Sequence, residues 1–282
     1  MNDDDNSKFK VYLVHPSSKH GVKLPKTISF RNLVDYVKKK VEAVKDIQNS
    51  AIKFFYKDGS MSLNIVDDDS IFHGEMKIIL LIAVSGNHLD VWVDLMWVHR
   101  PSDADWAMTG GFFSACVLDG NLRGYWANGV KYPVSWCDVE KVLFPINEPR
   151  KHWALGELHI RTGVVTIYDS FRQHTYRHIW WNKTMPEVFG YRLPKYLKEH
   201  GVLSAKGIDA DEYAITWRYA DNVPQQCTAY GDCGIWVCIN LYRLVHNMSL
   251  YAEDPAKTSL AYRERMVDYL WKQKIECDGK QG

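Results

Sequence analysis

The chain has 282 residues, of which 46% are hydrophobic and 13% aromatic, enough apolar material for one large or two modest globular domains. Lysine and arginine number 35 against 34 aspartate and glutamate residues, so no overall positive field draws the protein to nucleic acid or to an anionic membrane. Its partners must therefore be selected by local surface features.

The location of the protein is predicted from its first residues and its longest apolar run. The start, MNDDDNSKFK, is acidic and polar, whereas a secretory signal needs a basic end followed by an apolar stretch. Residues 78–84 are much shorter than the roughly 20 residues of a membrane span and predict a buried strand. We therefore expect a soluble protein of the nucleus and/or cytoplasm, whose six cysteines are reduced thiols.

The first 85 residues predict a small domain of strands around one helix. Residues 9–14 alternate apolar and polar side chains as a half-buried strand does, and residues 22–24 are its expected hairpin partner. The stretch SFRNLVDYVKKKVE predicts an amphipathic helix, and three more strands follow in IKFFY, MSLNIV and KIILLIAV. This order of elements is the β-grasp pattern of ubiquitin-like domains.

Residues 8–84 resemble a Phox-and-Bem-type domain, a ubiquitin-like interaction module. Such domains pair through a basic residue on the first strand and an acidic loop on the partner; Lys10 matches the basic position, and KDGSMS retains fragments of the acidic loop. The resemblance implies a β-grasp domain as partner of this segment. Turn residues at 85–88 place the domain boundary there, giving an interaction domain over 1–85 and a second domain over 86–282.

The second domain predicts a mixed α+β fold. WALGELHI and GVVTIYDS form a hairpin joined by a turn at residues 161–163, and an irregular, aromatic-rich stretch follows it. ITWRY then predicts a strand, and apolar residues resume at helical spacing after Gly234. A last amphipathic helix is expected over residues 261–274.

Three residues of this domain are candidates for a thiol hydrolase site. Cys233 is expected near a helix N-terminus, where partial positive charge and a nearby imidazolium lower the pKa of a thiol. His152 begins one strand of the hairpin and Asp169 follows the other, 17 residues later. The two ends of a tight hairpin are neighbours, so a carboxylate that orients the histidine is expected beside it.

The motifs that contain these residues resemble the Ulp-type proteases. FPIN followed after four residues by HW, then IYDS, then PQQ shortly before DCG, is the order found in these clan CE, papain-like cysteine peptidases, which process and deconjugate SUMO and related modifiers. The resemblance runs from about Trp136 to Leu244. It implies that His152 is the base, Asp169 the orienting residue and Cys233 the nucleophile, with no cofactor and no metal.

The resemblance also implies roles for residues around this triad. Trp153 corresponds to an aromatic that covers the Gly-Gly tail of the substrate, and Trp106 stands for the tryptophan that opens the family's N-terminal lobe. Gln226 is our choice for the oxyanion donor, since its amide and the Cys233 N–H would stabilise a tetrahedral oxyanion. The family's glutamine lies six residues before the cysteine, but here Cys227 occupies that place and Gln226 lies seven before.

The implied function is hydrolysis of the bond after the C-terminal glycine of a ubiquitin-like modifier, with the SUMO class favoured. A non-enzymatic module that binds such modifiers or β-grasp partners is the rival hypothesis, and acyl transfer by the same thiol is a third. Histidines at 174 and 178 have a zinc-like HxxxH spacing but no third ligand nearby, so surface or core roles are favoured. Trp180 and Trp181 fit either an exposed substrate patch or the core.

Overall fold

The computed structural model describes residues 8–15, 18–25, 35, 39, 54–58, 61–65, 86–149, 151–226 and 232–278. The chain divides into two compact units, one of Val84–Pro255 and one of Met1–Ala83 with Ala256–Gly282. The helices and strands are β1 (Lys8–His15), β2 (Ser18–Pro25), β3 (Phe54–Asp58), β4 (Met61–Ile65), α2 (Gly86–Val98), β5 (Trp106–Met108), α3 (Phe112–Asp119), η4 (Gly124–Trp126), η5 (Trp136–Asp138), β6 (Lys141–Glu148), β7 (His152–His159), β8 (Val164–Tyr168), α4 (Arg172–Thr175), the π-helix η6 (Trp180–Thr184), α5 (Met185–Glu199), α6 (Val202–Ala205), β9 (Thr216–Tyr219), α7 (Cys233–Val245) and α8 (Pro255–Asp278).

The N-terminal segment contains two antiparallel hairpins in its described part. β1 pairs with β2, which confirms the predicted hairpin, and β3 pairs with β4, the two strands predicted in IKFFY and MSLNIV. Asp35 and Lys39 are helical, within the stretch expected to form the helix, while the rest of that stretch and the strand expected at residues 78–84 lie outside the described residues. The β-grasp fold of residues 1–85 therefore stays a prediction.

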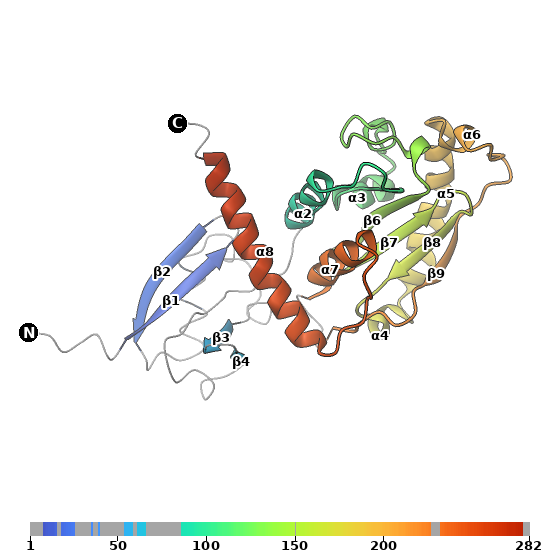
Figure 1. Ribbon diagram of the computed structural model, residues 1–282. Helices are drawn as coiled ribbons and strands as arrows, with labels where there is room; N and C mark the ends of the chain where they lie inside the picture. Colours follow the sequence, from blue (N-terminus) through green and yellow to red (C-terminus); the bar gives the residue numbers. More distant parts are fainter. Residues whose placement is uncertain are drawn as a thin grey trace, which may run out of the picture. The chain divides into compact units, whose positions relative to one another are not determined.

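A five-stranded sheet organises the unit from Val84 to Pro255. Its strands lie in the order β5-β6-β7-β8-β9 (Figure 1), with β6, β7 and β8 antiparallel and the two outer strands parallel to their neighbours. The predicted hairpin of β7 and β8 is confirmed. Gly163 closes its turn with a φ of +66°, a left-handed conformation that glycine adopts without the cost a Cβ would add.

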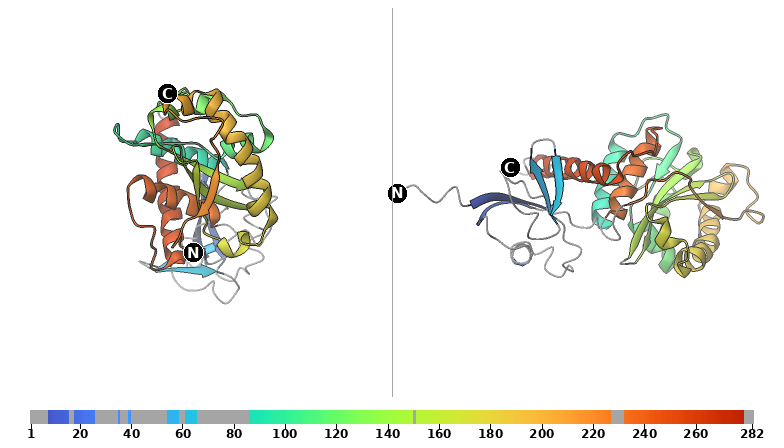
Figure 2. Two further views of the ribbon diagram at one scale, coloured as in Figure 1. Left: turned by 90° about the vertical axis from the view of Figure 1, so that its right-hand side faces the viewer. Right: turned by 90° about the horizontal axis from the view of Figure 1, so that it is seen from below.

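Helices cover both faces of this sheet. The left view of Figure 2 shows α7 on one side of the strands and α5 on the other. On the α5 side the rings of Phe144 and Phe189 stack 6.1 Å apart, and Phe113 packs edge-on against Phe144 and Trp136. All these rings are buried, so this aromatic cluster fixes α3 and α5 against β6.

Two stretches differ from the sequence-based expectations. Residues 86–88 of the predicted turn are the start of α2, whose Leu89 and Val93 are buried. The stretch described as irregular contains the 15-residue helix α5, which begins beside Pro186 and contains Pro194. Proline usually breaks a helix, but it is tolerated in the first turn, where Pro186 lies. Pro194 lies inside the helix, and the burial of the apolar face of α5 stabilises the helix despite it.

The last two predicted helices are present. α7 begins at Cys233, as expected from the apolar spacing after Gly234, and α8 contains the predicted stretch 261–274. The mixed α+β class is confirmed. None of the helices in the described part of the chain combines the length and the apolar character needed to cross a bilayer.

Candidate active site

His152 and Asp169 meet at one end of the sheet. His152 is the first residue of β7, and Asp169 directly follows β8, so the hairpin brings the two ends together. The imidazole Nε2 lies 2.7 Å from Asp169 Oδ1, and the two residues are 3% and 2% exposed. The sequence-based expectation of this contact is confirmed.

Three hydrogen bonds converge on the Asp169 carboxylate. Its Oδ1 accepts from His152 and from the backbone N–H of Phe171 (2.8 Å), and its Oδ2 accepts from the Thr175 hydroxyl. Burial alone would raise the pKa of Asp169, but these donors and the charge of His152 outweigh burial and lower it. Asp169 is therefore held as a carboxylate. Thr175, which the sequence reasoning did not single out, supports it from α4.

The hydrogen bond to Asp169 determines which ring nitrogen of His152 can react. A carboxylate only accepts, so Nε2 carries the proton, and Nδ1 is the ring nitrogen that can serve the Cys233 thiol, which lies close enough to raise the pKa of the ring. Burial lowers the pKa of His152, yet the hydrogen bonds and charges of Asp169 and Cys233 outweigh it and raise the pKa to about 9. The ring is thus poised as an imidazolium beside the thiol.

Cys233 occupies the first position of α7 and is half-buried. The unpaired N–H groups at a helix start carry partial positive charge, which stabilises a thiolate more than a thiol. The helix packs against β7, and the Cys233 side chain lies close enough to the first residue of that strand to raise the pKa of the His152 ring. The structure therefore brings Cys233, His152 and Asp169 together from three separate elements.

Gln226 lies beside this group and is 7% exposed. Its backbone N–H donates to the Ser170 carbonyl (2.7 Å), and its side-chain Oε1 accepts from the Ser170 hydroxyl (3.0 Å). The carbonyl end of the amide is thus engaged by Ser170, and the NH₂ end is the group that would act as donor to an oxyanion.

Gln225 has a different set of partners. Its Nε2 donates to the backbone carbonyls of Asp169 (3.1 Å) and Val223 (2.9 Å), and its Oε1 accepts from the Arg172 N–H (3.0 Å). Both ends of this amide are engaged by the backbone around Asp169. Gln225 is therefore a clamp between two chain segments, and the role of Gln226 as oxyanion donor stays a prediction.

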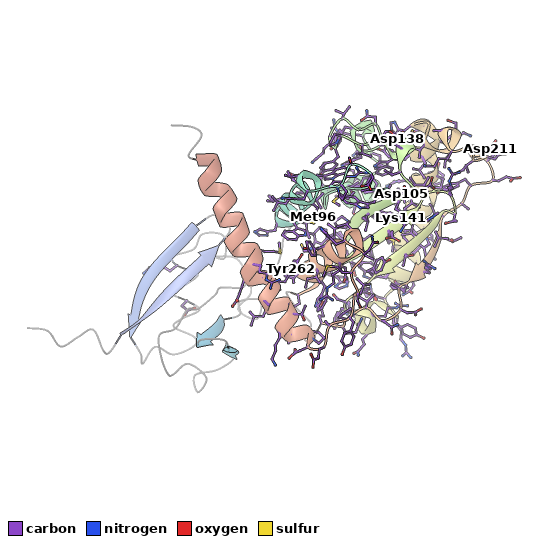
Figure 3. The ribbon with its side chains drawn as sticks, in the orientation of Figure 1. Met96, Asp105, Asp138, Lys141, Asp211 and Tyr262 are labelled. Atoms are coloured by element: carbon purple, nitrogen blue, oxygen red, sulfur yellow. The ribbon has the colours of Figure 1, made fainter. Side chains whose placement is uncertain are left out.

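The two tryptophans expected to bind substrate lie at different ends of the sheet. Trp153 follows His152 in β7 and is half-exposed, next to the triad. Trp106 pairs with Lys141, which in turn pairs with His159 at the far end of β7 (Figure 3 labels Lys141). The structure does not bring Trp106 to His152. The resemblance of the segment around Trp106 to the family's N-terminal lobe did not show with which residues of β6 this tryptophan pairs.

The remaining side chains that the sequence raised have structural partners. His174 and His178 stack on each other 5.5 Å apart, and no group of three or more metal-ligating side chains exists in the described part of the chain. Trp181 is buried and hydrogen-bonds to Glu148, which favours the core over a substrate patch, while Trp180 is half-exposed. Cys238 is buried, and Cys227 lies outside the described residues.

An open cavity of about 790 Å³ adjoins the Asp169 side of the group. Its lining includes Asp169, Arg172, Tyr219 and Gln225, and the Arg172 guanidinium lies 3.5 Å from the centre of the Tyr219 ring. Neither Cys233 nor His152 lines it. The cavity therefore lies behind the orienting carboxylate and does not mark where a scissile bond would sit.

Known proteins with the same architecture are cysteine proteases. The model of the Ulp1 protease family, C-terminal catalytic domain, matches residues 121–276. The SUMO protease Ulp1 with its catalytic cysteine oxidised to a sulfinic acid is 17% identical at a TM-score of 0.50, covering 68% of this chain and 78% of that chain. Its sulfonic acid form is 15% identical at a TM-score of 0.50, covering 89% and 99%.

A third solved structure, the C-terminal Ulp1 protease domain in complex with Smt3, the yeast orthologue of SUMO, is 15% identical at a TM-score of 0.49, covering 88% and 98%. A search of curated proteins found no match. At these identities the structural likeness shows the fold. The family model spans more than half of the chain and contains Cys233, His152 and Asp169. The chain belongs to the Ulp1 protease family through its C-terminal catalytic domain, and it is a cysteine protease.

Proposed function

We propose that the protein hydrolyses the peptide or isopeptide bond after the C-terminal glycine of a ubiquitin-like modifier, with the SUMO class favoured. Cys233 is the nucleophile, His152 the acid and base, Asp169 the residue that orients it and Gln226 the oxyanion donor. The observation that carries this proposal is the buried 2.7 Å contact between His152 and Asp169, with the Cys233 thiol on the same imidazole.

The proposed reaction has two stages. The Cys233 thiolate attacks the glycine carbonyl carbon, and the resulting oxyanion is stabilised by the Gln226 amide and the N–H of Cys233. The tetrahedral intermediate collapses to a thioester as Nδ1–H of His152 protonates the leaving amine. The now neutral Nδ1 then takes a proton from water, which attacks the thioester and releases the modifier with a free carboxylate. No cofactor takes part.

The substrate class is supported by the family and by the residue next to the base. The relatives with a TM-score of 0.50 are SUMO proteases. Trp153, half-exposed beside His152, is proposed to cover the narrow Gly-Gly tail, because a tail without side chains can pass beneath an aromatic ring. A bulkier C-terminal residue would not fit under such a cover, so cleavage is expected only after glycine.

Covalent labelling with a panel of modifiers that bear C-terminal electrophiles tests the proposal. We expect a SUMO-class probe to form a thioether with Cys233, identified by mass spectrometry of the adduct. Cys233→Ala should abolish labelling, and Cys137→Ser, which alters another incompletely buried thiol, should leave it unchanged. Binding of a modifier without labelling by any probe, and without cleavage, would instead support the binding-module hypothesis. Acyl transfer to an added amine in place of hydrolysis would support the third hypothesis.

We also propose that residues 1–85 form a separable β-grasp interaction domain, that the protease domain spans 86–282, and that the protein is intracellular. The support is the order of strands and helix in the sequence and the hairpins β1–β2 and β3–β4. Lys10 on β1 is the proposed contact for an acidic loop of a partner. Limited proteolysis should cut first near residues 85–89; a first cut inside either predicted core would contradict the boundary.

A further inference from the structure

A buried carboxylate outside the triad lies beside His152. Glu148, the last residue of β6, is 2% exposed. Its Oε2 accepts from Trp181 Nε1 at 2.7 Å, and its Oε1 accepts from Lys151 Nζ at 2.9 Å. His178 Nδ1 lies 3.4 Å from Oε1 without the geometry of a hydrogen bond. A carboxylate is buried only where donors replace its lost hydration, and here these donors are Trp181 and Lys151.

The register of the sheet places Glu148 on the face of the catalytic histidine. Glu148 and His152 are cross-strand partners in the β6–β7 ladder, and the side chains of such partners share one face. The indole of Trp181 fills the space there: it is 1% exposed, and its ring lies 5.5 Å from the His152 ring at an angle of 68°. The Trp181 indole thus contacts the Glu148 carboxylate on one side and the His152 imidazole on the other.

A second row of rings closes the same side. Phe171 and His174 lie 6.1 and 6.5 Å from the His152 ring, and they stack on each other at 5.4 Å. His174 stacks in turn on His178, which returns to Glu148. The contacts therefore form a closed loop that begins and ends at this carboxylate and passes through His152.

The hydrogen bond to Asp169 alone does not fix the plane of the imidazole. One N–H···O contact is an axis about which the ring can turn, and a turn moves Nδ1 away from the Cys233 sulfur. An edge-on aromatic neighbour blocks that rotation, since packed rings resist displacement. A displacement of about 1 Å at a reacting group costs up to about a hundredfold in rate, so the support matters for chemistry.

We infer that Glu148 is a positioning residue for the catalytic histidine: it tethers the Trp181 indole, and the indole holds the plane of the His152 ring. The inference rests on the proposed roles of His152 and Cys233. It assigns to Glu148 no contact with substrate. Its effect reaches the reacting atoms through Trp181.

The test measures alkylation of Cys233 by iodoacetamide as a function of pH, followed by mass spectrometry of its peptide. Glu148→Ala and Trp181→Leu should each lower the rate at pH 6 by about tenfold, because the displaced imidazolium no longer holds the thiolate. Glu148→Gln keeps an acceptor for the indole N–H and should stay within about twofold of the parent. The double variant Glu148→Ala/Trp181→Leu should lose no more than Trp181→Leu, since both act on one contact.

Matched controls separate positioning from general stability. Glu140→Gln alters a carboxylate at the opposite end of the sheet, next to Lys206 and Arg161, and should leave the alkylation profile unchanged. If the Glu148 variants lower the melting temperature but leave the profile of Cys233 unchanged, the residue is structural and the inference is wrong. Additive losses in the double variant, or no rescue by glutamine, would also overturn it.

Two further outcomes are distinguishable. If Glu148→Ala does not fold, Trp181→Phe carries the test, because it keeps a ring but removes the donor to Glu148; we expect about a threefold loss at pH 6, and an unchanged profile would refute the inference. If the parent protein alkylates only as an ordinary thiol near pH 8.5, the Cys233–His152 pair itself fails, and the proposed function fails with it.

Discussion

The two ends of the five-stranded sheet carry similar charged groups in opposite surroundings. At one end Asp169 and Glu148 are almost completely buried, and each accepts several hydrogen bonds. At the other end Glu140, whose side chain is 27% exposed, pairs with Arg161 (2.9 Å), which is 54% exposed, and with Lys206 (3.2 Å), which is 4% exposed. The comparison shows that burial, and not the type of residue, separates a site from an ordinary surface.

The difference has an energetic reason. Exposed ion pairs contribute about 0 to 1 kcal/mol because water screens them and because side-chain entropy opposes their order. Buried charges interact strongly, but they must be desolvated, so they persist only where the geometry is good. The end with Asp169 is thus expensive to build and sensitive to change, and the end with Glu140 is neither. The following predictions test this contrast.

The largest effect is expected at the nucleophile. Cys233→Ser should lower cleavage of a modifier fused to a reporter by roughly 10⁴ or more, since a hydroxyl beside the same base is far harder to ionise than a thiol. Binding of the modifier should persist, as measured by titration calorimetry. Substantial residual turnover would show that another group performs the chemistry.

A second large effect is expected at the orienting carboxylate. Asp169→Asn should lower kcat on the order of 10³, because an amide neither compensates the imidazolium charge nor fixes the same tautomer. Thr175→Val, which removes one donor to Asp169, should cost about tenfold by the same measurement. A kcat unchanged by Asp169→Asn would mean that His152 does not depend on this partner.

The neighbouring glutamines should separate oxyanion stabilisation from clamping. Gln226→Ala should lower kcat by about 10² to 10³ with modifier binding nearly unchanged, since its hydrogen bond strengthens mainly in the transition state. Gln225→Ala should affect kcat much less and stability more, because its partners are backbone groups. Steady-state kinetics with thermal unfolding would measure both; the reverse order would exchange their roles.

The pH dependence of stability should reveal the buried pair. Folding raises the pKa of His152 from about 6.5 to about 9, so the protonated ring stabilises the folded state. This stabilisation is fully present below about pH 6.5 and is lost as the pH rises through 9. Folding lowers the pKa of Asp169, so the ionised carboxylate stabilises the folded state above about pH 3.9, its unfolded pKa. This stabilisation is lost as the pH falls through the pKa that Asp169 has in the folded protein. The excess stability over Asp169→Asn should therefore be greatest between about pH 4 and 6.5 and shrink toward pH 9.5 in thermal unfolding. A constant difference would contradict this.

The smallest effect is expected at the exposed end. Glu140→Gln should change the free energy of unfolding by about 0.5 kcal/mol or less and leave kcat within about twofold. Denaturant unfolding and the reporter assay would measure these quantities. A large effect there would remove the contrast between the two ends.

The elements nearest to the chemistry were predictable because their signals are local. The alternation in β7 and β8 and the turn at Gly163 bring His152 to Asp169 without knowledge of any other element. The helical spacing after Gly234 likewise placed Cys233 at a helix start. The α5 helix was missed because its prolines obscured the pattern.

The supports of the site could not be predicted in the same way. Trp181 lies 33 residues from Glu148, and Gln226 lies 56 residues from Ser170, so no local pattern links the partners. The position of Trp106 could not be predicted for a different reason. It depends on the pairing of β5 with Lys141 and its neighbours in β6, which the local resemblance around this tryptophan does not show. Side-chain contacts across the fold depend on register and packing, which short motifs do not encode.

The attachment of the two glutamines changes how the spacing of this motif should be counted. Gln225 is tied to Asp169 and Arg172, and Gln226 is tied to Ser170 by main chain and side chain. The positions of both glutamines are thus fixed by the residues that follow β8 and not by the cysteine. The extra residue between Gln226 and Cys233 therefore lengthens the connecting segment and does not move the Gln226 amide. In an alignment or a redesign, the gap therefore belongs after Gln226, and a chimeric loop should be grafted between that residue and Asp232.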